Sequence, residues 1–471
     1  MSNAIFTPPV PHNEPVLSYA PGTTERTALQ AEYDRRVKTT IDAPMWIGGK
    51  AVETKDMRKM SPPHRHAHKL GMSHHGDARH VRAAIDAALK AKRDWENMPW
   101  EERASIFLKA AELISGPYRA HINAASMLAQ SKNCFQAEID AACELADFLR
   151  FNVAYMTQIY RDQPQSAAGI WNRMEYRPLE GFVLAITPFN FTSIAGNLPS
   201  APALMGNTAV WKCADTQIYS AQVIMEVFRK AGLPDGVINL IHVSGQDVGD
   251  VAFSHKEFAG VHFTGSTKVF RTIWGEIGNN LSNYRSYPRI VGETGGKDFV
   301  VAHPSADSLA VATALSRGAF EYQGQKCSAA SRAYIPENIW PQVKNALLED
   351  LAAMKIGDPR DFKNFINAVI DEKSFDKITG YIAGAKTDKA NNKVIAGGKS
   401  DKSTGYFIEP TVIETKDPKS VTMCEEIFGP VLTVHVYSSN RWMDTLKLVD
   451  ATGQYALTGA VFAQDRAAIV Q

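Results

Sequence analysis

The stretch "GFVLAITPF" (residues 181–189) begins the part of the chain whose pattern indicates the fold class. It is followed, up to residue 266, by "NTAVWKC", "SAQVIMEVFRKAG", "VINLIHV", "DVAFS" and "GVHFTGS". Short apolar runs that alternate with helical stretches are typical of β-α-β units, whose parallel strands are buried on both faces. The pattern therefore predicts an α/β fold with a doubly wound parallel sheet.

A second series of the same kind runs from "RIVGETGGKDFVVAHP" (289–304) to "GAVFAQD" (459–465). Two doubly wound parallel-sheet domains are therefore expected. A crevice between two such domains would be a suitable site for a ligand.

The segments before residue 181 have a different character. "MWIGGKAVE" (45–53) predicts a hairpin that turns at Gly48–Gly49. Residues 77–158 have the apolar spacing of amphipathic helices, with Asp77 as the first cap. The Pro-rich start, with one charged helical stretch at 24–40, is expected to wrap over the surface.

Length and composition limit the class of protein. With 471 residues, 45% of them hydrophobic and 21% charged, the chain is typical of a globular protein with more than one domain. A net charge of +1 gives no basic excess for nucleic acid or anionic lipid. There is no apolar run of roughly 18 residues, and the start lacks the features of a secretory signal. We expect no membrane partner and a cytoplasmic location, or the mitochondrial matrix in a eukaryote.

The cysteines point to a reducing compartment. There are five, an odd number without a CxxC pair, which argues against a disulfide framework or structural zinc. Cys327, in "FEYQGQKCSAASRAY" (320–334), could be a buried apolar residue, a redox partner, a metal ligand or a nucleophile. A cysteine hydrolase would need a histidine to activate the thiol, and after His262 only His303 and His435 remain.

Two motifs suggest a metal site and a phosphate-binding loop, but their residues do not support either. Six of the 13 histidines lie between residues 64 and 80, but no cysteine is near and no suitable helical pair exists. We therefore predict a solvated loop there rather than a metal site. "VGETGGKDF" (291–299) lacks the spacing of a phosphate-binding loop, which leaves Glu293 at the start of a glycine-rich turn that could approach a ligand closely.

Two further motifs are weak when taken singly. "FTGSTKVF" (263–270) could place a pyrophosphate at a helix N-terminus, but it has one glycine. "AITPFNF" (185–191) puts Asn190 at the carboxyl end of a strand, where its amide could donate to an oxyanion. An ordinary turn asparagine would fit the same pattern.

Together, "TPFNF", "WKCAD", "FTGS", "GETGGK", "GQKCSA" and "EEIFGPV" resemble, in order, the motifs of the aldehyde dehydrogenase superfamily. The resemblance covers essentially the whole chain. It is closest to the monofunctional branch that acts on 1-pyrroline-5-carboxylate, because "NEPVLSYAPGTTER" (13–26), "AEIDAACELADFLRFN" (137–152) and "FEYQGQKCSA" (320–329) are similar to that branch.

This resemblance implies a division of the chain. It implies an N-terminal extension and the helical part of the cofactor-binding domain at 1–160, an oligomerisation hairpin at 161–180, an NAD-binding part at 181–290 and a catalytic domain at 291–471. The implied assembly is a homodimer or a higher homo-oligomer. The chain stops at "AQDRAAIVQ", where the family continues. If that part is absent, we expect a raised KM for the substrate and little discrimination against uncharged short aldehydes, because donors to the substrate carboxylate are missing. We also expect an exposed sheet edge that makes the chain prone to association instead of a defined oligomer.

The resemblance also implies a reaction. Cys327 would be the nucleophile, Glu293 the general base, and Asn190 with the N–H of Cys327 the oxyanion hole. Ser328 would contact the carboxylate of the substrate, glutamate semialdehyde, which would be oxidised to glutamate. Alternatives are a dehydrogenase for another small aldehyde, a reductase running in the opposite direction, and a non-catalytic scaffold.

The implied cofactor is NAD, and no metal is implied. Asp215 would accept from the free 2′-OH of the adenine ribose, which favours NAD over NADP. Cys213 stands where the family usually has proline, and little effect on chemistry is expected. The implied cofactor-binding residues are Thr187 and Phe189 lining the site, Lys212 and Asp215 at the adenine ribose, Gly265 and Ser266 at the pyrophosphate, and Glu426 with Phe428 at the nicotinamide ribose.

Overall fold

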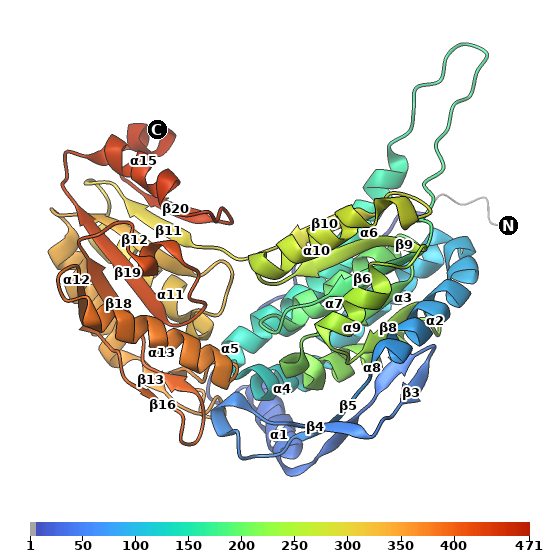
Figure 1. Ribbon diagram of the computed structural model, residues 1–471, viewed down its shortest axis with the longest axis horizontal. Helices are drawn as coiled ribbons and strands as arrows, with labels where there is room; N and C mark the ends of the chain where they lie inside the picture. Colours follow the sequence, from blue (N-terminus) through green and yellow to red (C-terminus); the bar gives the residue numbers. More distant parts are fainter. Residues whose placement is uncertain (1–5) are drawn as a thin grey trace. The chain divides into compact units, whose positions relative to one another are not determined.

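A computed structural model describes residues 6–471, which divide into two compact units (Figure 1). Each unit has its own sheet, which confirms the predicted α/β class with two parallel-sheet regions. Unit 1 comprises the residues up to Ser61, Lys69–Ala129 and Ala137–Glu293. Unit 2 comprises Pro62–His68, Gln130–Gln136 and Thr294–Gln471.

The main sheet of unit 1 has seven strands in the order β10-β9-β6-β7-β8-β2-β3 (Figure 1). Its parallel strands are β6 (Phe182–Ile186), β7 (Ala209–Lys212), β8 (Ile238–Ile241), β9 (Phe258–Thr264) and β10 (Arg289–Glu293). β2 (Met45–Ile47) and β3 (Lys50–Val52) form the predicted hairpin. Its turn uses Gly48 and Gly49, both at positive φ, where glycine is unstrained.

Strand β6 shows why helices cover both faces of this sheet. Phe182 and Leu184 lie in one core with residues of α2, α9 and α10, and the alternate residues Val183 and Ala185 are buried on the other face. α7 packs against β6, β7 and β9. The helices here are α1 (Thr24–Lys38), α2 (Ala78–Asn97), α3 (Trp100–Ser115), α4 (Arg119–Gln130), π-helix η2 (Glu138–Cys143), α6 (Glu144–Arg161), α7 (Thr192–Leu204), α8 (Ile218–Ala231), α9 (Gly245–Ala252) and α10 (Thr267–Asn279), with short η3 (Asp215–Gln217) and η4 (Leu281–Asn283). Most of α5 (Cys134–Ala137) belongs to unit 2.

The histidine-rich segment is not a solvated loop, so that prediction is wrong. It forms η1 (Pro63–Arg65) and β5 (Gly71–His75), the central strand of a sheet with β1 (Ile41–Ala43) and β4 (Asp56–Met60). His64, His74 and His75 are buried because their rings have polar partners, such as Asp42 for His74 (3.1 Å). Across residues 6–471, no group of three or more histidine, cysteine, aspartate or glutamate side chains could hold a metal ion.

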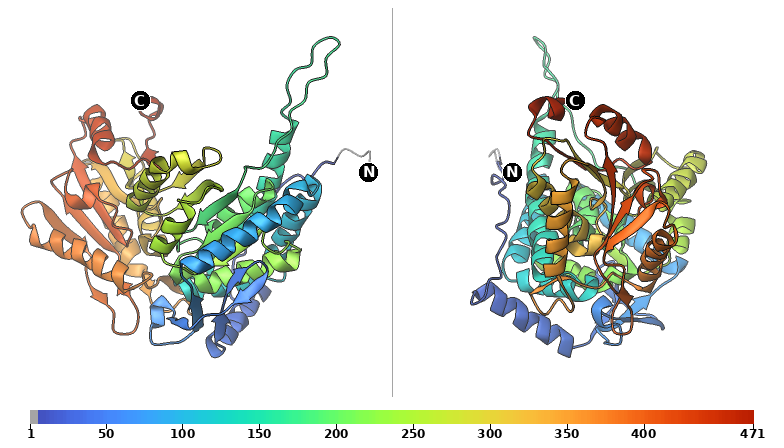
Figure 2. Two further views of the ribbon diagram at one scale, coloured as in Figure 1. Left: turned by 45° about the vertical axis from the view of Figure 1, so that its right-hand side comes forward. Right: turned by 90° about the vertical axis from the view of Figure 1, so that its left-hand side faces the viewer.

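Residues 162–181 form two extended arms that project from the end of α6 (Figures 1 and 2). They contain no strand, and side-chain bonds tie them together instead, such as Gln163 with the backbone of Met174 (2.8 and 3.2 Å). At the tip, Trp171 is 90% exposed and Ile170 58% exposed.

The sheet of unit 2 has the order β15-β18-β19-β12-β11-β20. It begins at Asp298 rather than at Arg289, because β10 pairs with β9 and so completes the sheet of unit 1. α11 and α12 share one core with the sheet, whereas α13 and α15 belong to two others. The strands are β11 (Asp298–Ala302), β12 (Ala330–Pro336), β18 (Thr411–Thr415), β19 (Val431–Tyr437) and β20 (Gly459–Phe462), all parallel, and antiparallel β15 (Asn392–Ala396).

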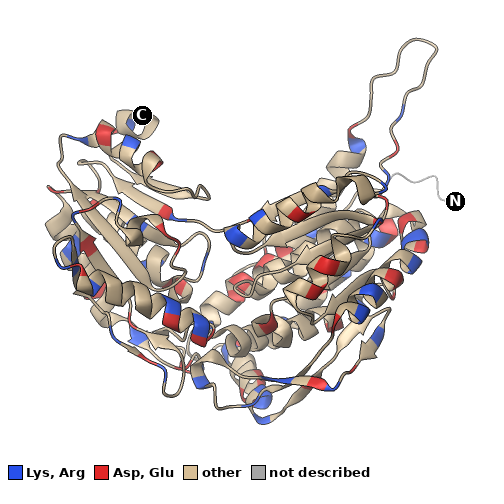
Figure 3. Cartoon of the chain, in the orientation of Figure 1, with Lys and Arg blue, Asp and Glu red and all other residues tan. Residues whose placement is uncertain are grey.

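Shorter elements complete unit 2. Its helices are α11 (Ser308–Phe320), η5 (Glu321–Gly324), α12 (Trp340–Ala353), α13 (Glu372–Thr387), α14 (Val421–Cys424), α15 (Trp442–Thr452) and α16 (Arg466–Val470), and its small strand pairs are β13 (Lys355–Ile356) with β14 (Asn364–Ile366) and β16 (Ser400–Asp401) with β17 (Phe407–Ile408). Acidic and basic residues are interspersed along the helices of both units (Figure 3). None of the helices described between residues 6 and 471 has the length and apolarity needed to cross a bilayer.

Candidate active site

In unit 1, the predicted site residues follow the carboxyl ends of parallel strands. Thr187, Phe189 and Asn190 follow β6, Lys212 ends β7, Gly265 and Ser266 follow β9, and Glu293 ends β10. Parallel strands end at the same edge of a sheet, so the fold collects these residues along one edge.

The turn after β6 is held by its neighbour β7. Thr187 is buried; its N–H donates to the carbonyl of Lys212 (3.1 Å), and its hydroxyl accepts from the indole N–H of Trp211 (3.0 Å). Asn190, three residues further on, is also buried. Packing and hydrogen bonds therefore fix this turn. Such support is what a turn needs if it is to hold the Asn190 amide in one position.

Lys212 and Asp215 lie together at the end of β7. The Lys212 Nζ is 3.7 Å from Oδ1 of Asp215, and the carboxylate is about half-exposed at 52%. Between them, Cys213 is fully buried, and burial raises the pKa of its thiol to about 12. This cysteine is therefore a neutral core residue, and the small effect expected from its replacement of proline stays a prediction.

Gly265, Ser266 and Glu293 also lie side by side. The N–H of Gly265 donates to the carbonyl of Glu293 (3.1 Å), and the hydroxyl of Ser266 caps α10 by accepting from the N–H of Val269 (3.3 Å). α10 is 13 residues long, and its first N–H groups offer a place for an anion. A carboxylate for a ribose and a helix N-terminus for a pyrophosphate on one sheet edge fit a dinucleotide such as NAD.

In unit 2, the predicted residues lie at the opposite kind of edge. Cys327 and Ser328 precede β12, and Glu426 and Phe428 precede β19, so they lie at the amino ends of the parallel strands. The usual rule for α/β sheets places ligands at the carboxyl ends. The position of this group therefore follows from the motifs and not from the strand pattern.

The glycine-rich turn "GETGGK" brings the backbone close to other protein groups. The N–H of Gly296 donates to Oε1 of Glu426 (3.0 Å). A Cβ at Gly295 would lie 2.3 Å from Oε2 of Glu426, and one at Gly296 would lie 2.2 Å from the carbonyl oxygen of Cys327. Only glycine fits at Gly296, because backbone blocks a side chain there, whereas the neighbour of Gly295 is the end of the Glu426 side chain. The turn links the Cys327 loop to Glu426.

Glu426 lies in a partly buried setting. Burial raises its pKa, although the N–H of Gly296 and the nearby Lys377 oppose the shift. Lys377 also donates to the Glu426 carbonyl (3.0 Å). Two residues later, Phe428 has a φ of 59°, a strained value for an aromatic residue.

The loop before Cys327 is strained, which the sequence reasoning missed. Tyr322, Gln323 and Gly324 have φ values of 51°, 54° and 64°, and the first two are not glycine. Such strain persists only where the surroundings hold it. The buried Gln323 side chain provides that hold, because it donates to the carbonyls of Ser131 (3.2 Å) and Ala368 (3.0 Å).

Two more contacts brace the same loop. The Gln323 Oε1 accepts from the N–H of Asn367 (3.0 Å), and the Gln325 Oε1 accepts from the N–H of Ile370 (2.9 Å). Lys132 is fully buried with its Nζ 3.9 Å from the ring centre of Tyr322. One feature of the sequence could have indicated this loop: a glutamine stands on each side of the glycine just before the cysteine, and glutamine is uncommon in buried loops.

Buried charges lie next to the glycine turn. Lys297 is 1% exposed, and burial lowers the pKa of its amine to about 7. Its Nζ has no hydrogen-bond partner among residues 6–471. Asp298 has a pKa raised to about 6 by burial, and Arg332 donates to the Lys297 carbonyl (2.8 Å).

The comparisons with known proteins agree with these motifs. The aldehyde dehydrogenase family model matches residues 46–471. The delta-1-pyrroline-5-carboxylate dehydrogenase of Agaricus bisporus is 49% identical over 470 residues, which are 99% of this chain and 86% of that protein. The mitochondrial enzyme of that name from Homo sapiens is 46% identical over 456 residues, 96% of this chain and 81% of that protein.

Solved structures give the same result. The crystal structure of the Mycobacterium tuberculosis delta-pyrroline-5-carboxylate dehydrogenase bound with NAD matches with a TM-score of 0.96 and 50% identity, over 100% of this chain and 86% of that one. A 1-pyrroline-5-carboxylate dehydrogenase from Thermus with bound NAD matches at 28% identity and a TM-score of 0.91, over 100% of this chain and 89% of that one. The chain therefore belongs to the aldehyde dehydrogenase family.

Proposed function

We propose that this chain oxidises L-glutamate γ-semialdehyde, the open form of 1-pyrroline-5-carboxylate, to L-glutamate with NAD, the second step of proline catabolism. The observation that carries the proposal is the 50% identity, over the whole chain, to a delta-pyrroline-5-carboxylate dehydrogenase solved with NAD. The presence of Cys327, Glu293 and Asn190 supports an active enzyme rather than a scaffold.

Each residue then has a chemical role. The Cys327 thiolate adds to the aldehyde carbon, and the oxyanion that forms is stabilised by the Asn190 amide and the N–H of Cys327. NAD, when bound, supplies the hydride acceptor. Loss of the hydride leaves a thioester on Cys327. Glu293 removes a proton from water, which hydrolyses the thioester to the carboxylic acid.

The residues assigned to NAD have suitable chemistry. Asp215 would accept from the adenine ribose beside Lys212, and the first turn of α10, after Gly265 and Ser266, would hold the pyrophosphate. Glu426 would accept from the nicotinamide ribose, with Phe428 beside it. Thr187 and Phe189 would line the cofactor side, and Ser328, which is exposed, would donate to the substrate carboxylate.

The extended arms at 162–181 support a homo-oligomer. Ile170, Trp171 and Met174 are 58%, 90% and 51% exposed. Apolar side chains at a projecting tip are suited to burial against a second copy of this chain. Light scattering on wild type and Trp171→Asp tests this: the variant should dissociate, and an unchanged mass would argue against the arms. A reducing compartment, the cytoplasm or the mitochondrial matrix, suits five cysteines with no disulfide among residues 6–471.

NADH formation with three aldehydes tests the activity. We expect glutamate semialdehyde to give a higher kcat/KM than an uncharged short aldehyde, and a dicarboxylic semialdehyde of different length to lie between them. Equal turnover of all three would favour a general aldehyde dehydrogenase. Faster reduction of glutamate by NADH than oxidation of the aldehyde would favour a reductase, and NAD binding without turnover would favour a scaffold.

A further inference from the structure

The small sheet of unit 1 is attached to the edge that carries Lys212 and Asp215. The N–H of Gly76, just after β5, donates to the carbonyl of His242 (2.8 Å), which follows β8. The His242 ring shares a second hydrogen bond with the carbonyl of His74 (3.1 Å). Because β8 is the neighbour of β7, these bonds hold the small sheet beside the end of β7.

One face of the small sheet carries polar side chains toward this edge. Arg58 on β4 is paired with Ser73 on β5, and Asp56 with His75, so all four side chains share a face. The Ser73 hydroxyl and the His75 ring share a hydrogen bond with each other (3.0 Å). The Arg58 side chain is longer and extends beyond them.

Arg58 reaches Asp215. Its Nη2 is 3.0 Å from Oδ2 of Asp56, and its Nη1 is 3.9 Å from Oδ2 of Asp215. The other oxygen of Asp215 is 3.7 Å from the Lys212 Nζ. The Asp215 carboxylate therefore lies between two cations, one near each oxygen.

These ion pairs are poor candidates for a stabilising role. The side chains of Arg58 and Asp215 are 55% and 52% exposed, and exposed pairs contribute little to folding stability. The same exposure leaves the guanidinium and the carboxylate accessible to a ligand. A carboxylate here accepts from a ribose hydroxyl and repels a phosphate, whereas an arginine attracts a phosphate in bidentate geometry.

We propose that Arg58 is a second determinant of cofactor choice, acting together with Asp215. The inference rests on the proposed function, which puts the adenine ribose at Asp215. With Asp215 present, its carboxylate offsets part of the charge of Arg58 and Lys212 and repels a 2′-phosphate; Asp56 remains the nearer partner of Arg58. When Asp215 has lost its charge, Arg58 and Lys212 form a pair of cations suited to a 2′-phosphate. The variant enzyme is therefore able to use NADP.

The test compares kcat/KM for NADP in Asp215→Asn and in the double variant Asp215→Asn with Arg58→Ala. The first should raise kcat/KM for NADP by about tenfold or more, since a hydrogen bond to a charged group is worth that factor. The double variant should lose most of this gain. Arg79→Ala is the matched control, because Arg79 also pairs with an aspartate two residues earlier, Asp77 (2.8 Å), and should not alter the gain.

Dissociation constants for NADP and NAD, measured by titration calorimetry without aldehyde, separate this inference from the proposed function. The inference predicts that Arg58→Ala weakens NADP binding to Asp215→Asn and changes NAD binding much less. If Asp215→Asn gained the same affinity for NADP with and without Arg58, the inference would be overturned. If glutamate semialdehyde gives no NADH but the binding constants follow this pattern, the proposed substrate fails and the role of Arg58 stands.

Discussion

Both units bury charged side chains near a loop, but the two groups differ in how well they are partnered. In unit 1, every charge among Glu14, Arg119, Glu138 and Arg150 is in an ion pair. In unit 2, the buried Lys297 amine has no hydrogen-bond partner among residues 6–471. Saturated networks rigidify a fold, whereas unpartnered buried groups cost stability and persist where function needs them.

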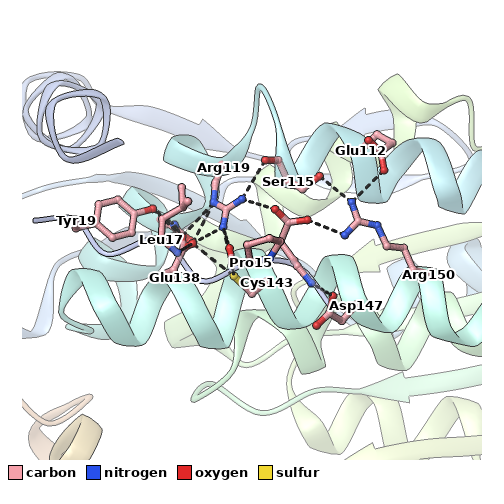
Figure 4. Close-up of polar contacts among 12 residues, drawn as sticks. Pro15, Leu17, Tyr19, Glu112, Ser115, Arg119, Glu138, Cys143, Asp147 and Arg150 are labelled. Atoms are coloured by element: carbon pink, nitrogen blue, oxygen red, sulfur yellow. Dashed lines mark hydrogen bonds and ion pairs between the residues drawn. The ribbon is translucent and has the colours of Figure 1, made fainter. Parts of the chain in front are cut away.

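The network of unit 1 fixes the N-terminal strap, residues 13–19 (Figure 4). The Glu138 carboxylate is fully buried and pairs with Arg119. It also accepts from the Tyr19 hydroxyl (2.7 Å) and the N–H of Leu17 (2.9 Å). Burial alone would raise the pKa of Glu138, but these hydrogen bonds outweigh it and hold the pKa below its ordinary value.

The partly partnered group of unit 2 lies beside the strained loop of Cys327. Gly296 touches the Cys327 carbonyl on one side and Lys297 follows it in the chain. Both the strain and the unpartnered charge reduce stability. The comparison therefore predicts that changes near Cys327 affect activity, and that changes in the strap affect stability.

The largest effect is expected for Cys327→Ala. Removal of the covalent route should lower NADH formation by more than about a thousandfold. NAD binding should be retained, because the residues assigned to the cofactor are elsewhere. The melting temperature should change little. Residual turnover above a thousandth of wild type, measured by NADH absorbance, would exclude Cys327 as the sole nucleophile.

Glu293→Gln should affect one step of the reaction. Loss of the general base should slow thioester hydrolysis by about 10²–10⁴-fold and leave acylation less affected. We expect a rapid burst of about one NADH per site, followed by slow turnover. Stopped-flow absorbance measures both phases. Equal loss of both would assign Glu293 to acylation or to the structure.

Glu138→Ala should have the largest effect on stability. It leaves Arg119 with one fewer carboxylate in a buried site, which typically costs about 3–5 kcal/mol. Because its pKa is held low, the stability that Glu138 contributes should be present above the ordinary glutamate pKa and be lost as the pH falls through the folded value. Urea unfolding at two pH values measures it.

The matched control is Glu112→Ala. Glu112 also pairs with an arginine of this network, Arg150 (3.0 Å), but it is 72% exposed. Its removal should cost less than about 1 kcal/mol. Equal destabilisation by the two variants would show that burial does not explain the strength of the network.

The sequence predicted those features that depend on local pattern. The apolar strand at 182–186, the turn at Gly48–Gly49 and the cap at Asp77 follow from local hydropathy, backbone freedom and hydrogen bonding within a few residues. The six family motifs identified the candidate site in the same way. What failed depends on partners distant in the sequence.

Four examples show this limit. Membership of β10 in the first sheet depends on pairing with β9, and the burial of His74 depends on Asp42. The strained backbone at Gln323 depends on Ser131 and Ala368. Two of the three stretches that mark the branch, 13–26 and 137–152, were identified separately, but only the structure shows that Glu14 of one pairs with Arg150 of the other (2.7 Å).

Lys297→Met should stabilise unit 2 at low pH. Burial depresses the pKa of Lys297 to about 7 from an ordinary value of about 10.4. Below about 7 the amine is charged in both folded and unfolded states, so the cost of burying it is fully present. Between those values the unfolded chain binds more protons, so stability rises with pH and the cost fades.

The expected gain for Lys297→Met is about 1–4 kcal/mol at pH 6 and much less near pH 10. Lys419→Met, at an exposed position of the same unit, should give no such pH dependence. Urea unfolding of both variants at the two pH values measures the difference. A destabilised Lys297→Met at pH 6 would mean that the amine has a stabilising partner, and the contrast between the two units would fail.

The smallest effect is expected at the exposed end of the strap. The Asn13 amide donates to Oδ2 of Asp147 (2.8 Å), and the N–H of Glu14 donates to Oδ1 (2.6 Å). Asn13→Ala removes the first of these two bonds, which is exposed to solvent, and leaves the second. It should therefore lower the free energy of unfolding by only about 0.5–1 kcal/mol. In limited proteolysis, the strap of Asn13→Ala should be cleaved only slightly faster than that of wild type, whereas the strap of Glu138→Ala should be cleaved quickly. If Asn13→Ala frees the strap as readily as Glu138→Ala, docking begins at this exposed end. The buried charges would then follow docking rather than cause it.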